Sequence, residues 1–408
     1  MMLADVARPE EAGLSAAGLD GVDAGLQALI DKGELAGAVT LVARHGRVAR
    51  RSVLGFDSLE KKTKLKTDTV FRIFSMTKPV TAVAMMILHD KGLWKPDDPV
   101  GKFIPAFNHC TVFEGLDDGE RLMTAKADHP PTLRELLTHT AGITYGRSDA
   151  LHDRPYKDAN IWGAPTLMEF AERIGRVPLA YQPGTQWLYS LSMDVQGAII
   201  EAITGQPLAD FMQEHIFGPL KMVDTAFWVP PQKAGRLAHS MYLTSRKGGL
   251  HELDKSPMGN DYLSPPRLAG GGGGLVSTLG DYARFAQMLL NKGELDGVRI
   301  LSPEAVALMS KNHLPEWMLS AGFGIGAMQI RPGFGYGFNG AVFTDPKAAG
   351  IPVGQGTYEW DGAAGTWFWV DWANDVIFVG MIQRFAVTPD ATNAQQLTQK
   401  LLAAAIMR

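Results

Sequence analysis

Residues 71–80 read FRIFSMTKPV, a stretch in which a serine precedes a lysine by three positions. That spacing puts the hydroxyl of Ser75 and the ammonium of Lys78 on one face of a helix, one turn apart. Pro79 lacks an N–H and is tolerated only in the first turn, so the helix is predicted to begin near Ser75. The positive end of the helix dipole then favours an alkoxide on Ser75, and Lys78, if largely desolvated, can act as its base.

The residues that follow this stretch predict a buried helix. Apolar side chains recur at the spacing of one helical face, at Val80, Val83, Ala84, Ile87 and Leu88. Lys91 and Gly92 supply a basic last turn and a glycine suited to the C-terminal end. The same Ser-x-x-Lys spacing also occurs at Ser58 and Lys61, in a Lys-rich polar stretch without an apolar helical pattern behind it. We interpret that second match as a solvated loop.

Both ends of the chain are predicted to form strands. Residues 36–53 hold two β-rich segments joined across His45 and Gly46, which is typical of a hairpin. Residues 365–381 form a second predicted hairpin, and residues 393–406 form a closing helix. Because consecutive hairpins pair antiparallel, we expect an antiparallel sheet built from both chain ends and covered by terminal helices.

The middle of the chain is predicted to be an inserted, mainly helical region. Apolar residues recur at helical spacing in three segments separated by Gly and Pro, residues 166–174, 194–203 and 208–215. The glycine run at residues 270–274 is interpreted as a turn into a helix. Thr278 and Asp281 have the spacing of a capping box that opens this helix, which runs through Leu290.

These patterns together predict the architecture. The fold class is α/β of the α+β type, with an antiparallel sheet flanked by helices and an inserted helical domain. We expect a discontinuous α/β domain over residues 1–95 and 240–408, which carries the nucleophile. Residues 96–239 form the predicted helical domain.

Composition narrows the class of protein. The chain has 408 residues, 46% of them hydrophobic, and its net charge is −4 without a basic block, so we expect no nucleic-acid partner. The N-terminal residues lack the basic start and apolar core of a secretory signal, and no apolar run is long enough to span a membrane. Cys110 is the single cysteine, and the ten histidines show no metal-binding spacing. We therefore expect a cytoplasmic protein without a metal, cofactor or membrane partner.

Further motifs occur in order along the chain. After FSMTK at residues 74–78 come DDPV at 97–100, LLTHTAGI at 136–143, QPGT at 182–185, GGGLVST at 272–278 and the strand at 365–371. In these motifs the sequence resembles the family VIII carboxylesterases, which are similar to class C β-lactamases and D-alanyl-D-alanine peptidases. The resemblance spans most of the chain. It implies a β-lactamase/transpeptidase-like fold and an acyl-enzyme formed on the serine.

The second catalytic motif of these enzymes is a Tyr-x-Asn triplet, and residues 189–191, Tyr-Ser-Leu, occupy its place. The resemblance makes Tyr189 the proton shuttle, a phenol hydrogen-bonded to Lys78 that relays a proton to the leaving alkoxide. Tyr181 is the rival, but it precedes a Pro-Gly turn, under which a tyrosine more often packs. Leu191 replaces the asparagine that recognises amide side chains, which points away from lactam substrates.

The third motif of the lactamases is Lys-Thr-Gly, and Trp360-Asp361-Gly362 stands in its place. The esterases have Trp-Gly-Gly there, so this chain matches them at the first and third positions and differs at the second. The resemblance implies an oxyanion hole made by the backbone N–H groups of Ser75 and Ala363, with the triplet lining the substrate pocket. A tryptophan in place of the lysine removes the charge that binds a carboxylate, so a neutral ester is expected.

Other patterns receive a structural interpretation. His139 lies in the LLTHTAGI signature and is interpreted as part of a helix-to-loop corner. The sequence has no Gly-x-Ser-x-Gly elbow, which disfavours an α/β-hydrolase fold with a histidine-based triad. Residues 335–340 match Gly-x-Gly-x-x-Gly, but no βαβ unit surrounds them, and we expect a strand and a turn. The aromatic residues at 367–369 are interpreted as core on a strand.

The motifs predict a serine carboxylesterase that hydrolyses small, short-chain neutral esters through an acyl-enzyme on Ser75, with Lys78 and Tyr189 as base and proton shuttle. An acyltransferase of the same fold, which passes the acyl group to an alcohol, stays open. So does a β-lactamase or D-alanyl peptidase. A non-catalytic, penicillin-recognising sensor is disfavoured because all three catalytic residue types are present.

Overall fold

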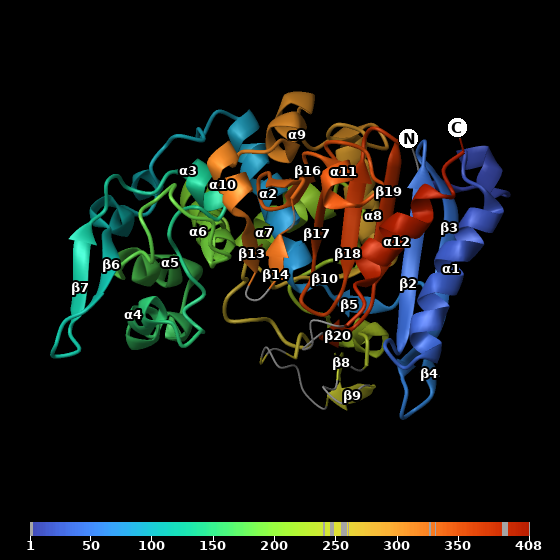
Figure 1. The fold of residues 1–408 in the computed structure, drawn as a ribbon, viewed down its shortest axis with the longest axis horizontal. Helices are drawn as coiled ribbons and strands as arrows, with labels where there is room; N and C mark the ends of the chain where they lie inside the picture. The colour runs from blue at the N-terminus through green and yellow to red at the C-terminus, as the bar shows by residue number, and fades with distance from the viewer. Residues whose placement is uncertain are drawn as a thin grey trace.

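In the part of the chain that the structure describes, nine strands form one sheet that joins the two ends of the sequence (Figure 1). The structure is a computed structural model that describes residues 3–239, 241–244, 249–253, 259, 261–325, 328–330, 332–385 and 391–407. In pairing order the strands are β1 (Ala4–Asp5), β3 (Arg47–Ser58), β2 (Gly37–Arg44), β19 (Val376–Met381), β18 (Trp367–Asp371), β17 (Tyr358–Asp361), β16 (Ala341–Phe343) and β15 (Phe334–Tyr336), with β4 (Thr63–Lys64) beside β3. The central pair, β2 and β19, comes from opposite ends of the chain.

Helices and smaller sheets surround this sheet. The helices are α1 (Ala16–Asp31), α2 (Thr77–Asp90), α3 (Leu133–Leu137), α4 (Arg154–Asp158), α5 (Leu167–Arg176), α6 (Ser192–Thr204), α7 (Leu208–Met212), α8 (Leu279–Leu290), α9 (Pro303–Ser310), α10 (Glu316–Ala321), α11 (Pro346–Ala349) and α12 (Ala394–Ala403). The smaller sheets pair β5 (Val70–Arg72) with β10 (Val276–Thr278), β6 (Thr111–Leu116) with β7 (Leu122–Lys126), β11 (Glu294–Leu295) with β12 (Val298–Arg299), β13 (Phe323–Ile325) with β14 (Met328–Ile330), and β20 (Arg384–Phe385) with β8 (Met241–Thr244) and β9 (Leu250–Leu253).

Both predicted hairpins are present. β2 and β3 pair antiparallel across His45 and Gly46, whose φ angles of 54° and 69° lie in the left-handed region that tight hairpin turns require. β18 and β19 also pair antiparallel, and Asp375 in their turn has a φ of 54°. The short edge strand β1 differs, because it runs parallel to β3. The sheet predicted from both chain ends is confirmed.

Helices cover both faces of the sheet. α1 and α12 lie against one face, and α8 lies against the other (Figure 1). Alternate residues of β18 enter two separate cores, Trp367 and Trp369 on the α1 side and Phe368 and Val370 on the α8 side. All four side chains are almost completely buried. The aromatic strand is therefore core, as the sequence indicates.

The segment between the sheet-forming ends is mainly helical. α5, α6 and α7 coincide with the three predicted segments, and α7 continues into a π-helical turn at Gln213–Phe217. The antiparallel β6–β7 hairpin, which projects at the left of Figure 1, is an addition that the sequence pattern does not predict. The division into two domains stays a prediction, and its boundary at residue 240 lies outside the described residues.

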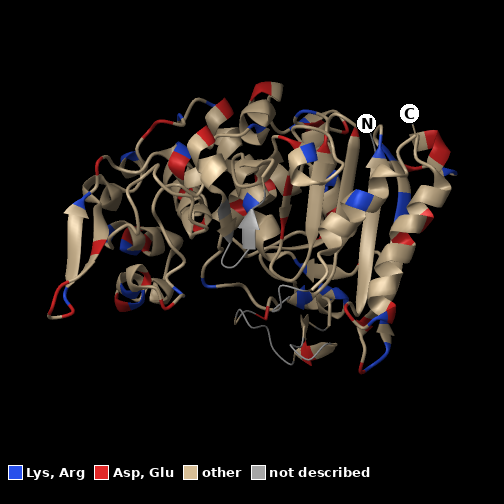
Figure 2. Ribbon diagram, viewed as in Figure 1, with Lys and Arg blue, Asp and Glu red and all other residues tan. Residues whose placement is uncertain are grey.

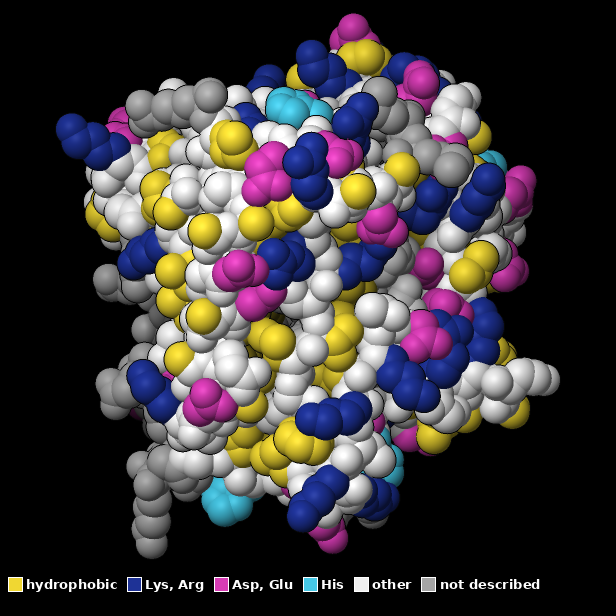
Figure 3. Space-filling model, turned by 90° about the vertical axis from the view of Figure 1, so that its right-hand side faces the viewer, with side chains coloured by type: hydrophobic (Ala, Val, Ile, Leu, Met, Phe, Trp, Pro, Cys, Tyr) yellow, Lys and Arg dark blue, Asp and Glu magenta, His cyan; other side chains and the backbone are white. Residues whose placement is uncertain are grey.

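Charged residues of both signs are spread along the ribbon (Figure 2). On the face that α1 covers, basic, acidic and hydrophobic side chains are interspersed (Figure 3). Among the described residues, no helix combines the length and the apolarity that crossing a bilayer requires.

A buried carboxyl group gives the fold a pH dependence. Glu359 on β17 is 8% exposed and accepts a hydrogen bond from Gln399 Nε2 of α12 at 2.5 Å. Burial raises the pKa of Glu359 from 4.5 to about 8. Between these two pH values the folded state therefore holds a proton that the unfolded state has lost, so stability falls as the pH rises through this window.

We expect Glu359→Gln to raise the free energy of unfolding at pH 9 by about 2 kcal/mol, because the amide stays neutral and still accepts the bond from Gln399. At pH 5 the two proteins should differ much less. Urea unfolding at both pH values measures the effect. Glu114→Gln, at an exposed position on β6, is the control. A Glu359→Gln protein no more stable than wild type at pH 9 would contradict the expectation.

Candidate active site

A short turn holds Ser75 at the start of α2. Residues Phe74–Met76 form a 3-10 turn, and α2 begins at Thr77. Phe74 has a φ of 42°, a left-handed conformation that costs a non-glycine residue about 1–3 kcal/mol and persists only where the surroundings enforce it. The hydroxyl of Thr77 accepts a hydrogen bond from Leu275 N at 3.1 Å, which ties the turn to the chain just before β10. Ser75 therefore lies at the N-terminal end of the helix.

Two side chains meet at the hydroxyl of Ser75. Lys78 Nζ donates to Ser75 Oγ at 3.1 Å, and Tyr189 OH donates to it at 2.7 Å. Lys78 is completely buried as the second residue of α2, and Tyr189 comes from the segment before α6. The ring of the rival Tyr181 lies against His152 instead, with centroids 5.8 Å apart. The structure thus brings together the three residues predicted to share the chemistry.

Lys78 has two further partners. Its Nζ donates to Tyr145 OH at 3.2 Å and to the carbonyl oxygen of Gly272 at 2.5 Å. The hydroxyl that Lys78 reaches is thus that of Tyr145, whereas Tyr189, for which we predicted this bond, meets Lys78 through its ring face at 4.6 Å. Burial raises the pKa of Tyr145 well above 10, which keeps it a neutral phenol. With Ser75 included, three acceptors satisfy the three donors of an ammonium group.

The glycine run takes part in the site, which goes beyond the predicted turn. A Cβ on Gly271 would lie 2.4 Å from Met193 O, and a Cβ on Gly272 would lie 2.6 Å from Asp194 Oδ2. Asp194 accepts a hydrogen bond from Gly272 N at 3.1 Å. Burial raises the pKa of Asp194, and the nearby charge of Lys78 opposes that rise. Glycine is required because only a backbone without Cβ atoms can approach α6 this closely.

His139 supports the ring of Tyr189. The two ring centroids are 4.8 Å apart, and His139 Nδ1 is 2.9 Å from Ser190 Oγ. His139 is 1% exposed and has a φ of 60° at a backbone corner. Burial, together with the charge of Lys78, lowers its pKa well below 6.5. This neutral and immobilised imidazole matches the corner that the sequence predicts.

The end of β17 forms another wall of the site. Trp360 is 5% exposed, and its ring centroid is 5.9 Å from that of Tyr189. Gly362 lies directly against the turn that carries the serine, because a Cβ on Gly362 would be 2.3 Å from Ile73 O. Trp360 and Gly362, two of the three residues predicted to line the pocket, therefore lie beside the predicted catalytic groups.

Asp361 stands where the related esterases have glycine. Its side chain is half-buried, and burial raises its pKa to about 6, against the opposing charge of Lys78. Ala363, two residues further along, is exposed. The oxyanion role of its N–H group stays a prediction.

The second Ser-x-x-Lys match differs from its predicted loop. Ser58 is completely buried at the end of β3 and donates to Glu252 Oε1 at 2.9 Å. Lys61 is exposed, and its Nζ lies 2.5 Å from His239 Nε2. The interpretation as a solvated loop is wrong for the serine, because Ser58 is completely buried and its hydroxyl donates to the partly buried carboxylate of Glu252. The pair does not form a Ser–Lys contact of the kind found at Ser75.

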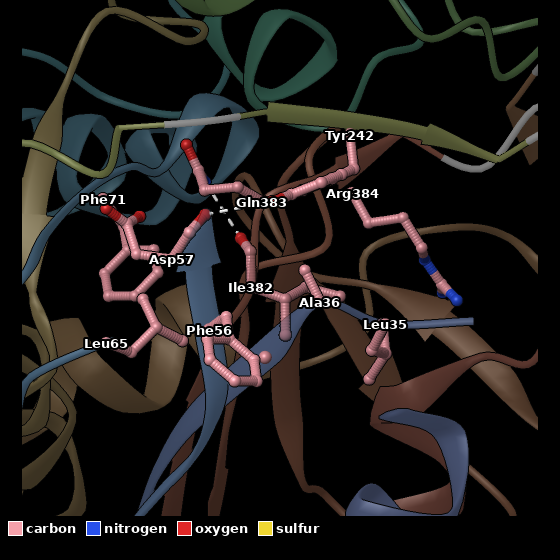
Figure 4. Close-up of a pocket in the computed structure, with 11 residues that line it drawn as sticks. Leu35, Ala36, Phe56, Asp57, Leu65, Phe71, Tyr242, Ile382, Gln383 and Arg384 are labelled. Atoms are coloured by element: carbon pink, nitrogen blue, oxygen red, sulfur yellow. Dashed lines mark hydrogen bonds between the residues drawn. The ribbon is translucent and has the colours of Figure 1, made fainter. Parts of the chain in front are cut away.

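A small cavity elsewhere in the molecule is separate from these groups (Figure 4). Its lining includes Phe56, Asp57, Tyr242 and Gln383 and contains none of the predicted site residues. The Asp57 carboxylate accepts the backbone N–H of His239 at 3.0 Å, and burial raises its pKa. We assign this cavity no part in the chemistry.

The fold and the arrangement of side chains around Ser75 are those expected of a β-lactamase-like serine hydrolase. The family model described as Beta-lactamase matches residues 22–403, and the chain therefore belongs to the β-lactamase family. Protein Rv1367c of Mycobacterium tuberculosis is 37% identical over 90% of each chain. Esterase EstB of Burkholderia gladioli is 31% identical over 84% of each chain. The solved structure of EstCE1, described as a hydrolase with promiscuous acyltransferase activity, has a TM-score of 0.77 at 26% identity and covers 96% of this chain and 99% of its own.

These comparisons confirm the predicted fold class and the resemblance to penicillin-binding-protein-like esterases. The sequence missed Tyr145 and Asp194. Tyr145 lies just beyond the LLTHTAGI signature, and nothing in its neighbourhood marks it. The glycine run was a visible signal for Asp194, because consecutive glycines indicate that a backbone approaches something closely.

Proposed function

We propose that the protein is a serine carboxylesterase that hydrolyses small, short-chain esters through an acyl-enzyme on Ser75. The observation that carries this proposal is the pair of hydrogen bonds to Ser75 Oγ, from Lys78 Nζ at 3.1 Å and from Tyr189 OH at 2.7 Å. A serine hydroxyl is a weak nucleophile unless a neighbouring group takes its proton. Here two groups able to hold or pass a proton touch the same oxygen.

In the acylation step, Ser75 Oγ attacks the ester carbonyl carbon, and Tyr189 takes its proton, reacting as a phenolate beside the Lys78 ammonium. The carbonyl oxygen becomes negative and is held by the N–H groups of Ser75 and Ala363, each worth about 2.7–4 kcal/mol in other hydrolases. Collapse breaks the bond to the alcohol oxygen, and Tyr189 returns the proton to the leaving alkoxide. The acyl group stays on Ser75.

In the deacylation step, a water molecule attacks the acyl carbonyl while Tyr189 takes its proton. Collapse of the second intermediate breaks the bond to Ser75 Oγ, and Tyr189 gives this oxygen the proton that it took from water. Lys78 is held in place throughout by Tyr145 and by the Gly272 carbonyl. This fixed position lets the ammonium stabilise negative charge on the nearby oxygens without moving.

The walls of the site favour esters over lactams. Leu191, in the place of the amide-binding asparagine, is completely buried in the core and offers no hydrogen bond to an amide side chain. Trp360 puts an indole where the lactamases have a cation, so the part of the substrate beside it is expected to be neutral. The esterase relative EstB supports the same substrate class.

Acyl transfer to an alcohol is the second candidate. It uses the same acyl-enzyme, with an alcohol in place of water, and the description of EstCE1 as a hydrolase with acyltransferase activity favours it. Product analysis of p-nitrophenyl butyrate turnover with added alcohols separates the two reactions, because transfer yields the new ester and hydrolysis yields butyrate.

The proposal is tested by labelling and by comparing substrates. A fluorophosphonate should label one peptide, that which contains Ser75, and should stop hydrolysis of p-nitrophenyl butyrate in proportion to the label. Nitrocefin should be turned over far more slowly than the ester. Labelling at another serine, or nitrocefin turnover faster than ester turnover, would overturn the assignment.

A further inference from the structure

Two arginines that meet at Trp162 have no acidic partner among the described residues. The guanidinium carbon of Arg147 lies 3.9 Å from the centroid of the Trp162 ring. Arg267 donates to the carbonyl oxygen of Gly163 at 3.0 Å and also to that of Trp162. Both arginines are exposed. Several other partly exposed arginines are ion-paired, for example Arg134, Arg173 and Arg236, whereas Arg44 and Arg47 bond to backbone carbonyls.

Each arginine is close in sequence to a segment that contacts Lys78. Arg147 follows Tyr145 by two residues, and Tyr145 OH is 3.2 Å from Lys78 Nζ. The charge of Arg147 acts to lower the pKa of Tyr145 and that of Asp194, against the effect of burial, so its field reaches the interior of the site. Arg267 lies three residues before the glycine run that supplies a carbonyl to Lys78.

The contacts hold the two guanidinium groups in place without using all their donors. Stacking on an indole occupies the face of a guanidinium and leaves the N–H groups at its edge free to bind. Arg267 uses N–H groups on two backbone carbonyls, and a guanidinium has five. Planar guanidinium edges match the two oxygens of a carboxylate better than any other side chain does.

We propose that Arg147 and Arg267 form a subsite for a carboxylate carried by the ester substrate, at an end remote from the bond that Ser75 attacks. The inference rests on the proposed esterase function and adds a substrate class, esters whose acyl chain ends in a carboxylate. It agrees with the neutral wall at Trp360, because the positive charge stands on the Tyr145 side of the site instead.

The test compares two substrates of equal shape. One is the p-nitrophenyl monoester of adipic acid, which carries a terminal carboxylate, and the other is the matching adipamic ester, which carries a terminal amide. At low salt the wild-type protein should favour the anionic ester by about tenfold in kcat/KM. In Arg147→Gln this ratio should fall to about one, Arg147→Lys should restore part of it, and added salt should reduce it in the wild type.

Arg121→Gln is the matched control, because Arg121 is an exposed arginine on the β6–β7 hairpin, paired with Asp117. It should keep the wild-type ratio. A wild-type ratio near one, with the amide ester still hydrolysed and its turnover lost in Ser75→Ala, overturns the subsite and leaves the esterase proposal standing. If neither ester nor p-nitrophenyl butyrate is turned over, the esterase proposal fails, and calorimetry with monomethyl adipate tests the subsite instead. Affinity unchanged by Arg147→Gln would then overturn it.

Discussion

Ser75→Ala is expected to reduce kcat/KM for p-nitrophenyl butyrate by about 10⁴-fold or more. The substitution removes the oxygen on which the acyl group is carried, and it leaves Lys78 and Tyr189 without the group that joins them. Residual activity of the size found in other hydrolases without a nucleophile would come from substrate binding and the oxyanion donors alone. Initial rates at saturating and at low substrate concentration measure the loss.

Ser58→Ala is the matched control for this experiment. Ser58 shares the Ser-x-x-Lys spacing, but its hydroxyl binds Glu252 at the end of β3. Losing that bond should lower the midpoint of thermal unfolding while ester turnover per folded molecule stays within about twofold of wild type. Ester turnover that survives Ser75→Ala and disappears in Ser58→Ala would reverse the assignment of the nucleophile.

Tyr189→Phe is expected to lower kcat by about 10²–10⁴-fold. The phenyl ring keeps the packing against His139 and Trp360, so the loss reports the hydroxyl that lies 2.7 Å from Ser75 Oγ. Pre-steady-state kinetics should show both acylation and deacylation slowed, because the same phenol serves both steps. A pH profile of kcat distinguishes two causes of this loss. Loss of a proton carrier removes one limb of the pH dependence of kcat, whereas a general loss of packing lowers kcat at every pH.

Two other tyrosines make this prediction specific. Tyr145→Phe removes the bond of 3.2 Å to Lys78 and is expected to cost roughly tenfold, because the ammonium keeps its other partners. Tyr181→Phe should keep full activity, since that ring lies against His152. If Tyr145→Phe costs as much as Tyr189→Phe, the proton is carried by both phenols and the assignment to Tyr189 alone is wrong.

The parts of this protein that the sequence predicts are those set by neighbouring residues. The hairpin turn at His45 and Gly46 and the helix start near Pro79 depend on local conformational preferences, and both are confirmed. The capping bond from Asp281 N to Thr278 Oγ1, at 3.2 Å, is likewise confirmed. The alternation along β18 and the helical spacing in α5 to α7 also predict these elements correctly. Apolar residues that recur with the period of a strand or a helix lie on one face of that element.

The parts that could not be predicted depend on segments that meet only in the folded chain. Tyr145, Asp194 and the Gly272 carbonyl lie on separate segments, and each meets the Lys78 region through tertiary packing. The pattern of neighbouring residues carries no information on the distance between segments that are far apart in the sequence. For the same reason Ser58 was predicted to be solvated although it is buried, because its partner Glu252 is far away in sequence.

The pairing of β2 with β19 has a consequence for how the protein is made. Arg44 pairs with Val376, and the turn that carries Ser75 rests against Gly362. During synthesis, β2, Ser75 and Lys78 leave the ribosome long before β19 does. One edge of β2 therefore stays unpaired until nearly all of the polypeptide has been synthesised. Contacts of such long sequence separation form slowly, and an open strand edge is prone to association with other chains. Premature termination before β19 would accordingly yield insoluble fragments instead of a folded protein of lower stability.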